Sequence, residues 1–502
     1  MIARIVALGT LLLHLATIWR YGYFRDELYF IACARHLAWG YVDQPPLVAF
    51  AAWLAGTLGF ALPALRLLPV LAAAIAAGLA VQIARDLAGG RFAQWCAGIA
   101  VALVPAYLSL GNVLTTTSFE GLSWLLALWC AVRIVRGGGT TWWIGLGASF
   151  AFGMYGKYSI ALLAVALVIG LLCTRERRIF ASRGLPVAVA TALVLLAPNI
   201  IWQGLHGWPM FEVLHGDAAH RPAFANGVAL EYRNLWSNAV AFSVEQVLYT
   251  NPVAVLLWLT GAAAPFAIAR LRDLRFVSIT YVVLFIIAVA LGAKGYYIVG
   301  VYGTLLAIGA VALEGARGWL RGLVLVLIVV VGVATMPISL PILSMPQFLA
   351  YSQAMHLTGT PPHLIQPIYA EEFGWTGLAR DVARVYQKLP AGERAHAAVY
   401  ADTYADAGAI DLFGPRYGLP SAIASQNTYY LWGTHGQEGR TLVAVGATRI
   451  DILKQWYGSC TLAATSSEPL KWVVEGPDPI YLCTHPRASL ETIWPHLRWY
   501  GA

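Results

Sequence analysis

Three carboxylates lie close together beside the first apolar run of the chain. The segment 24–47, FRDELYFIACARHLAWGYVDQPPL, holds Asp26, Glu27 and Asp43 in a region that is otherwise rich in hydrocarbon. Acidic side chains at the edge of a membrane are costly unless they serve a site, so this segment is the first candidate. A carboxylate there can accept the proton of a hydroxyl group, which is general-base chemistry. We interpret Asp26 as the base and Glu27 as a structural or assisting group.

Helix geometry separates the two adjacent acids. Neighbouring helical residues point about 100° apart, so only one of them faces a given cleft. Asp26 shares a face with Tyr29, Phe30 and Cys33, whereas Glu27 points elsewhere. A plainer alternative stays open, because two acids in the first turn of a helix are favoured by the helix dipole alone.

Two prolines follow Asp43 and Gln44 directly. A residue before proline is pushed out of the helical region, so the Pro45-Pro46 pair holds the preceding residues in one place. We therefore predict that Asp43 joins the catalytic group and that Gln44 contacts substrate. A simple helix start would explain the prolines but not an acid on an apolar background.

Lysine is scarce, and two lysines stand out. Of 33 basic residues only five are lysines, and only Lys157 and Lys294 precede residue 340. Each lies beside tyrosines at the predicted outer end of a span, where a compact cation can hold a phosphate. Snorkelling to lipid headgroups is the alternative. The other candidates for this anionic pocket or for substrate contact are Arg25, Arg221, Glu120, His206, Tyr296 and Tyr297. Irregular histidine spacing leaves a divalent metal open without indicating one.

The composition identifies the kind of protein that must position these residues. Hydrophobic residues make up 59% of the chain and charged residues 12%, against roughly 25% charged in soluble domains. The apolar runs do not alternate, so they predict membrane helices rather than barrel strands. The net charge of +8 comes mainly from arginines in short loops, so it bears on membrane topology and gives no indication of nucleic acid as a partner.

A span requires about 20 apolar residues, and we predict about eleven spans. They cover residues 2–19, 64–84, 92–110, 119–135, 141–155, 158–173, 185–201, 252–269, 276–293, 297–313 and 319–338. Residues 46–60 and 236–250 are predicted as helices lying at the membrane interface. Arginines gather in alternate loops, and the positive-inside rule then places the N-terminus in the cytoplasm. The segment 24–47 and the C-terminal part lie on the outer side.

The composition changes near residue 340. We predict a membrane domain over 1–340, a connector over 341–375 and a small extracytoplasmic α/β domain over 376–502 with a partly parallel sheet. The predicted strands are 396–401, 441–445 and 480–483, and the predicted helices are 376–388, 404–413 and 449–457. Cys460 and Cys483 could pair if this domain faces an oxidising compartment. A cluster of Asp402, Asp406, Asp411 and Arg416 in this domain could bind an acceptor or a partner, but we favour solvated surface charge.

The motifs of the first outer loop resemble those of the GT-C superfamily. Asp26-Glu27 followed by the run 43–47, DQPPL, is similar to the family 39/83 type, which includes protein O-mannosyltransferases and the aminoarabinose transferase of lipid A. Further segments fit bacterial family-39-like proteins: 66–69, 156–158, 197–199, 206–209, 294–297 and 408–419. The resemblance implies that Asp26 is the catalytic base. Gln44 departs from the family, which has a cationic or imidazole residue at that position. Many relatives have an aspartate within the segment that corresponds to 114–120, and here either Glu120 or the hydroxyl side chains of the segment would take its place.

The resemblance implies an inverting glycosyltransferase of the bacterial inner membrane. Its donor would be a polyprenyl-phosphate sugar, its acceptor a hydroxyl of a glycan, lipid or protein of the envelope, and its surroundings membrane lipids. Two other classes stay open: a polytopic lipid or glycan transporter, and a non-catalytic envelope assembly protein. A transporter should show ionisable groups near the membrane midplane or repeated halves, and the sequence shows neither.

Overall fold

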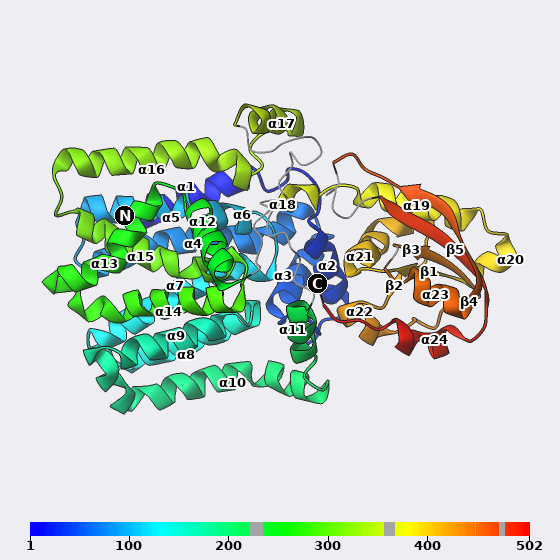
Figure 1. The fold of residues 1–502 in the computed structure, drawn as a ribbon, viewed down its shortest axis with the longest axis horizontal. Helices are drawn as coiled ribbons and strands as arrows, with labels where there is room; N and C mark the ends of the chain where they lie inside the picture. The colour runs from blue at the N-terminus through cyan, green and yellow to red at the C-terminus, as the bar shows by residue number, and fades with distance from the viewer. Residues whose placement is uncertain (220–233, 356–366, 447, 471–476, 502) are drawn as a thin grey trace. The chain divides into compact units, whose positions relative to one another are not determined.

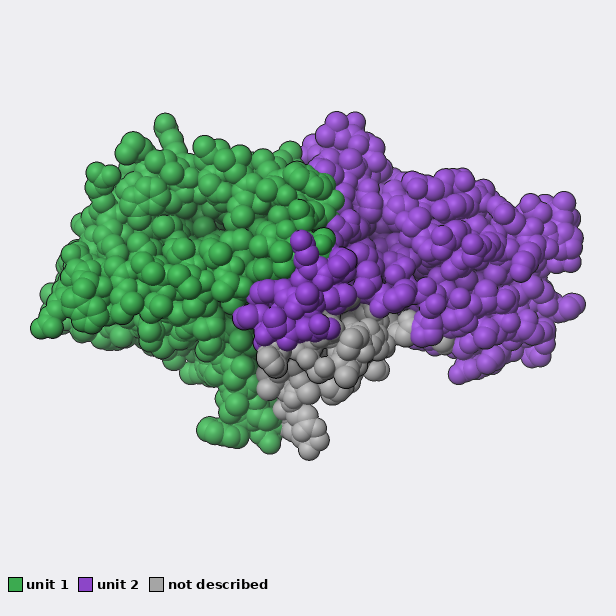
Figure 2. All heavy atoms as spheres, turned by 90° about the horizontal axis from the view of Figure 1, so that it is seen from above, with its two compact units in different colours: residues 1–20, 66–201, 223–344 green, residues 21–65, 202–222, 345–502 purple. Residues whose placement is uncertain are grey.

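Long apolar runs without charged interruptions form helices because a helix satisfies every backbone hydrogen bond within the segment. The computed structural model is accordingly mostly helical (Figure 1), and it describes residues 1–219, 234–355, 367–446, 448–470 and 477–501. The chain divides into two compact units (Figure 2). Unit 1 contains residues 1–20, 66–201 and 223–344, and unit 2 contains residues 21–65, 202–222 and 345–502. The carboxylate-bearing loop thus belongs to the same unit as the C-terminal part of the chain.

Unit 1 is built from helices. They are α1 (Ile2–Leu15), most of α4 (Leu62–Asp86), α5 (Arg91–Ala102), α6 (Pro105–Leu110), η1 (Thr116–Phe119), α7 (Glu120–Val135), α8 (Thr140–Gly156), α9 (Ile160–Leu172), η2 (Arg175–Ala181), most of α10 (Gly184–Leu205), α12 (Leu235–Tyr249), α13 (Ala254–Ala267), η3 (Ala269–Leu274), α14 (Arg275–Leu291), η4 (Gly295–Ile298), α15 (Val299–Leu313) and α16 (Gly318–Ser339).

Six helices in the described ranges are long and apolar enough to cross a membrane, and the chain is an integral membrane protein. The number rises to seven if α12 and α13, which meet at a bend of 110°, form one broken span. Helix occupies every one of the predicted spans, but several of these helices are shorter than a full crossing. The count of eleven therefore stays a prediction.

Small residues let the central helices of unit 1 approach closely. A Cβ atom added to Gly261 of α13 would lie 2.0 Å from the carbonyl oxygen of Leu305, and one added to Gly309 of α15 would lie 2.0 Å from that of Leu257. The two backbones are therefore in direct contact, as is common for helix pairs in membranes. Helix α15 is buried along nearly its whole length.

Unit 2 contains one mixed sheet with helices around it (Figure 1). The strands are β1 (Ala397–Ala401), β2 (Ile423–Ala424), β3 (Thr441–Val445), β4 (Tyr457–Ser466) and β5 (Asp478–Pro486). Their order is β2-β1-β3-β5-β4, with β1 parallel to β2 and β3, and β5 antiparallel to β3 and β4. This topology confirms the predicted small α/β domain with a partly parallel sheet.

The helices of unit 2 come from three parts of the chain, residues 21–65, 202–222 and 345–502. They are α2 (Arg25–Arg35), α3 (Leu47–Gly56), α11 (Pro209–Ala219), α17 (Met345–Ala354), α18 (Pro367–Ala370), α19 (Trp375–Gln387), α20 (Ala391–Arg394), α21 (Tyr404–Phe413), η5 (Gly414–Tyr417), α22 (Asn427–Trp432), α23 (Ile450–Trp456) and α24 (Leu490–Leu497). The predicted interfacial segments 46–60 and 236–250 are both helical, as α3 and α12. The predicted boundaries at residues 340 and 375 stay a prediction.

Helices α2 and α21 cross at a glycine. A Cβ atom on Gly408 would lie 2.8 Å from the carbonyl carbon and oxygen of Leu28, so only glycine permits this approach. The crossing joins the first loop to the C-terminal segment within unit 2.

Cys460 and Cys483 face each other on β4 and β5 and form a disulfide. The sequence left this pairing open, and the structure shows it.

The interpretation of the C-terminal acids as solvated charge is wrong for two of them. Asp402 and Asp406 are buried, and hydrogen bonds from neighbouring residues satisfy their polar groups. The backbone N–H of Arg449 donates to Asp402, and Thr403 forms hydrogen bonds with both the backbone and the side chain of Asp406.

Candidate functional site

Glu27 closes the start of α2. Its Oε2 accepts a hydrogen bond of 2.8 Å from the backbone N–H of Phe24, the residue before the helix, and its side chain is buried. This arrangement satisfies a backbone donor that the first turn of a helix leaves open. The placement favours the structural role of Glu27 over the assisting one.

Asp26 lies at the same helix start but stays accessible. Its side chain is 30% exposed, and its Oδ1 accepts a hydrogen bond of 3.1 Å from the hydroxyl of Tyr404. The guanidinium of Arg25 lies 3.7 Å from the same oxygen and also donates to the Tyr404 hydroxyl at 2.9 Å. A third contact joins Arg25 to Glu371 at 3.4 Å. Arg25, predicted to bind phosphate, is therefore placed beside the candidate base.

Asp43 is held by two donors. Its Oδ1 accepts from the hydroxyl of Tyr29 at 2.7 Å, and its Oδ2 accepts from the amide of Asn427 at 3.0 Å. Burial raises the pKa of Asp43 to about 7, and the negative charge of Asp26 adds to the rise, while the hydrogen bond from Tyr29 acts against it. The two predicted carboxylates are thus close enough to interact electrostatically.

We call Asp26, Asp43, Tyr29, Tyr404 and Asn427 the carboxylate cluster. Its rings also interlock, since Tyr29 stacks on Tyr404 with ring centroids 4.6 Å apart. Two neighbouring carboxylates with different hydrogen-bond partners, one of them with a raised pKa, form an arrangement that separates proton-accepting and proton-holding roles.

Gln44 lies in the interior of unit 2. Its side chain is 2% exposed, and its Nε2 lies 3.4 Å from the sulfur of Cys33. The predicted contact with substrate has no support in this position. His206 is exposed and stacks on the ring of Trp202 at 4.0 Å, with Nδ1 2.8 Å from the Trp202 carbonyl oxygen. Arg221 lies outside the described residues.

A second group of predicted residues comes together in unit 1, and we call it the lysine cluster: Lys157, Thr117, Glu120, Ser159, Tyr296 and Tyr297. Lys157 follows the end of α8, and its ammonium donates to the Thr117 hydroxyl at 2.9 Å. The same ammonium lies 4.8 Å and 4.4 Å from the ring centroids of Tyr296 and Tyr297, which are cation–π distances.

Glu120 supplies the negative charge of the lysine cluster. It is 4% exposed, accepts a hydrogen bond from the hydroxyl of Ser159 and interacts electrostatically with Lys157. Lys294 differs from Lys157, since it is exposed at the start of η4 and the described residues show no hydrogen bond or ion pair to its ammonium group. Of the two predicted phosphate-binding lysines, Lys157 is the one held in an organised site.

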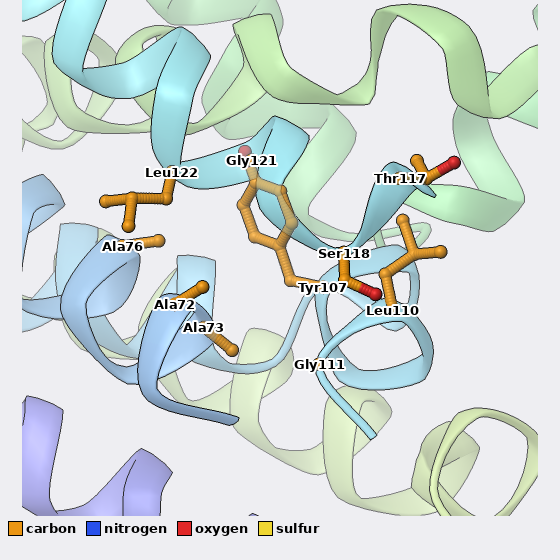
Figure 3. A pocket seen from close by; sticks show the side chains of 10 residues that line it. All are labelled: Ala72, Ala73, Ala76, Tyr107, Leu110, Gly111, Thr117, Ser118, Gly121 and Leu122. Atoms are coloured by element: carbon orange, nitrogen blue, oxygen red, sulfur yellow. The ribbon is translucent and has the colours of Figure 1, made fainter. Parts of the chain in front are cut away.

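A small pocket adjoins the lysine cluster through Thr117 (Figure 3). It is lined by Ala72, Ala73, Ala76, Tyr107, Leu110, Gly111, Thr117, Ser118, Gly121 and Leu122. In Figure 3 the Tyr107 ring points toward Gly121, which has no side chain to oppose it. Within the described ranges, His, Cys, Asp and Glu side chains do not form a group of three or more that could hold a metal ion.

The sequence did not predict two members of the carboxylate cluster, Tyr404 and Asn427, or the partner of Arg25, Glu371. Tyr404, Asn427 and Glu371 contact the first loop across 346 to 384 residues of sequence. Neither residue type nor local pattern singles them out, because each contact depends on how distant segments of the chain pack within unit 2.

Comparison with known proteins agrees with this architecture. Residues 43–202 match the family model for dolichyl-phosphate-mannose-protein mannosyltransferase. Among solved structures, the apo form of ArnT from Cupriavidus metallidurans is similar, with a TM-score of 0.60, 15% sequence identity, and coverage of 95% of this chain and 96% of that one. The form of that protein bound to undecaprenyl phosphate matches with the same score and identity, covering 95% of this chain and 97% of that one. Comparison with curated protein sequences gives no match.

The chain therefore has the fold of ArnT over nearly its whole length and the sequence pattern of the mannosyltransferase family across residues 43–202, which confirms the resemblance to the GT-C superfamily.

Proposed function

We propose that this protein is a GT-C type glycosyltransferase that moves a sugar from a polyprenyl-phosphate carrier to a hydroxyl group of an envelope glycan, lipid or protein. The observation that carries the proposal is the carboxylate cluster, where the partly exposed Asp26 lies beside Asp43, whose carboxylate is held by Tyr29 and Asn427. The ArnT structure with undecaprenyl phosphate supports the class of donor.

In the proposed reaction Asp26 accepts the proton of the acceptor hydroxyl. The hydroxyl oxygen forms a bond to the anomeric carbon as the bond from that carbon to the phosphate oxygen breaks. The electron pair of the broken bond stays on the phosphate, which leaves as polyprenyl phosphate. A single displacement inverts the anomeric centre. We propose separately that the lysine cluster of unit 1 binds the phosphate of the lipid carrier, because a fixed cation such as Lys157 offsets phosphate charge well in a site of low polarity.

We also propose that the carboxylate cluster faces the outside of the cell. A disulfide between Cys460 and Cys483 in the same unit is typical of an oxidising compartment. The distribution of arginines among the loops favours the same orientation. A bacterial inner membrane with the C-terminal segment in the periplasm fits both observations.

Mass spectrometry of lipids and envelope glycans from cells with and without the protein tests the proposal. We expect a polyprenyl-phosphate sugar to accumulate in the deletion strain and one glycan modification to disappear. Unchanged lipids and unchanged glycans would overturn the proposal and favour an assembly role. If the lipid accumulated only on the inner leaflet and the purified protein formed no glycosidic bond, a transporter would be favoured.

Complementation with Asp26→Asn tests the base. Because an amide cannot accept the hydroxyl proton, we expect transfer to fall at least 100-fold with normal amounts of protein in the membrane. Asp451→Asn is the matched control, since Asp451 is a highly exposed acid whose ammonium partner, Lys454, lies 3.5 Å away. Transfer by Asp26→Asn within twofold of the control would remove Asp26 from its role.

A further inference from the structure

The C-terminal segment reaches into the carboxylate cluster at two points. We infer that Tyr404 and Asn427 are positioning residues, with Tyr404 orienting Asp26 and Asn427 orienting Asp43. The inference rests on the proposed function and deepens it, because it assigns part of the transfer site to a portion of the chain some 380 residues from the carboxylates.

Contacts to its backbone and to its ring hold Tyr404 in place. Thr403 caps α21 by accepting from the backbone N–H of Asp406 at 3.1 Å, and the backbone N–H of Tyr404 donates to the side-chain oxygen of Gln426 at 2.8 Å. Its ring also contacts the guanidinium of Arg25, 5.4 Å from the ring centroid, and stacks on the ring of Tyr29. These contacts hold the Tyr404 hydroxyl in the position from which it donates to Asp26.

The hydrogen bond from Tyr404 is made to one particular oxygen of the Asp26 carboxylate. Among the described residues, the contacts from Tyr404 and Arg25 both reach Oδ1. The second oxygen, Oδ2, is then the one directed to an acceptor hydroxyl. A carboxylate held in one rotamer loses less freedom when the reaction occurs, so the bond lowers the barrier without contributing to substrate affinity.

Asn427 is held just as firmly. It is 1% exposed and has a φ of 51°, a left-handed conformation that asparagine tolerates better than most residues. Its backbone N–H donates to the carbonyl of Trp499 at 3.1 Å, and its Oδ1 accepts from the backbone N–H of Gly501 at 3.0 Å.

The bond to Gly501 settles which end of the Asn427 amide faces Asp43. A backbone N–H can only donate, so the amide oxygen must face Gly501 and the NH₂ group must face the carboxylate. Asn427 therefore presents a donor to Asp43 and cannot turn without breaking a buried bond.

The test uses the full-length protein in lipid nanodiscs. The probe is the polyprenyl-phosphate sugar that accumulates in the deletion strain, extracted and added back with the acceptor that lacks the modification. For Tyr404→Phe we expect a 10- to 100-fold lower kcat with the KM for donor within twofold of the wild type. Tyr429→Phe is the matched control, because Tyr429 also donates a hydrogen bond to an aspartate of the same unit, Asp411 at 2.7 Å, outside the carboxylate cluster. We expect its kcat within twofold of the wild type.

Asn427→Asp tests the second half of the inference. It keeps the size of the side chain but sets an acceptor against Asp43, so we expect the pH–rate profile to move to higher pH by about one unit. An unchanged profile would overturn the role of Asn427. A wild-type kcat in Tyr404→Phe, or an equal loss in Tyr429→Phe, would overturn the role of Tyr404.

Labelling of Asp26 by a water-soluble carbodiimide in native membranes gives a measure that needs neither activity nor purification. We expect Tyr404→Phe to increase labelling of Asp26 severalfold relative to Asp451, and equal labelling would contradict the inference. Failure of the proposed function is recognised separately, because the wild-type protein would then transfer no sugar.

Discussion

Asp43 sits between a tyrosine hydroxyl and an asparagine amide, and both donate to it. Its pKa is raised by burial to about 7, whereas its ordinary value is 3.8. At neutral pH a small change in its surroundings therefore changes its charge. When Asp43 is ionised, a second negative charge lies beside Asp26 and favours proton acceptance by it.

This titration predicts how stability depends on pH. Because the folded protein binds the Asp43 proton more tightly than the unfolded chain, the stabilisation is complete below pH 4 and is lost as the pH rises through 7. Asp43→Asn cannot titrate. The stability of this variant relative to the wild type should therefore increase by roughly 1–2 kcal/mol between pH 5.5 and pH 8.

Thermal unfolding in detergent at the two pH values measures this difference. Asp451→Asn, at an exposed position, should show no such dependence. If the difference between Asp43→Asn and the wild type were the same at pH 5.5 and pH 8, Asp43 would not titrate in this range.

The two lysines differ in their surroundings, and so should their variants. Lys157 is held by Thr117 and two tyrosine rings, whereas Lys294 is exposed. A charge-assisted contact contributes about 1.5–3 kcal/mol, so Lys157→Gln should weaken binding of undecaprenyl phosphate about tenfold or more. Native mass spectrometry with undecaprenyl phosphate measures the affinity. We expect less than a threefold change for Lys294→Gln, and the reverse order would move the phosphate role to Lys294.

At the scale of elements, the crossing of α2 and α21 decides whether the carboxylate cluster forms. Gly408 allows this crossing because a Cβ there would lie 2.8 Å from the backbone of Leu28. Gly408→Ala should force the helices apart and move Tyr404 away from Asp26. We expect transfer at least 10-fold lower and a melting temperature several degrees lower.

Gly392→Ala provides the control for this helix crossing. Gly392 lies in α20 of the same unit, and a Cβ there would meet nothing within 4 Å. If Gly408→Ala were as active and as stable as Gly392→Ala, the close approach would not be needed.

The sequence predicts elements well where one local signal dominates. Apolar runs predicted the membrane helices, and β1, β3 and β5 of the sheet lie where short apolar segments predicted strands. Strand β4 was missed because most of its side chains are exposed on both faces, so its sequence shows no alternation of polar and apolar residues.

The candidate site was predictable only in part. Asp26 and Asp43 stood out as acids on an apolar background, and the structure places them together. Tyr404 and Asn427 could not be found in the same way, since their importance comes from tertiary contacts over some 380 residues. The burial of Gln44 was not predictable either, because its position beside a motif does not determine its exposure, and its contact with substrate stays a prediction.

For the whole molecule, the central prediction is the orientation of the loops. In a Cys173→Ser background, a cysteine at the exposed position 392 should react with a membrane-impermeant maleimide in intact spheroplasts. A cysteine at position 178, in a loop predicted to be cytoplasmic, should react only after permeabilisation. Gel-shift analysis reports both reactions. The opposite pattern would place the carboxylate cluster in the cytoplasm.

Unit 2 joins residues 21–65 to residues 345–502, and this has a consequence for biogenesis. Asp26 leaves the ribosome 378 residues before Tyr404, and Asp43 leaves it 384 residues before Asn427. A nascent chain can therefore insert most of its helices into the bilayer while both acids still lack their partners. Incomplete chains from stalled translation would therefore remain in the membrane without transferring sugar from the lipid carrier.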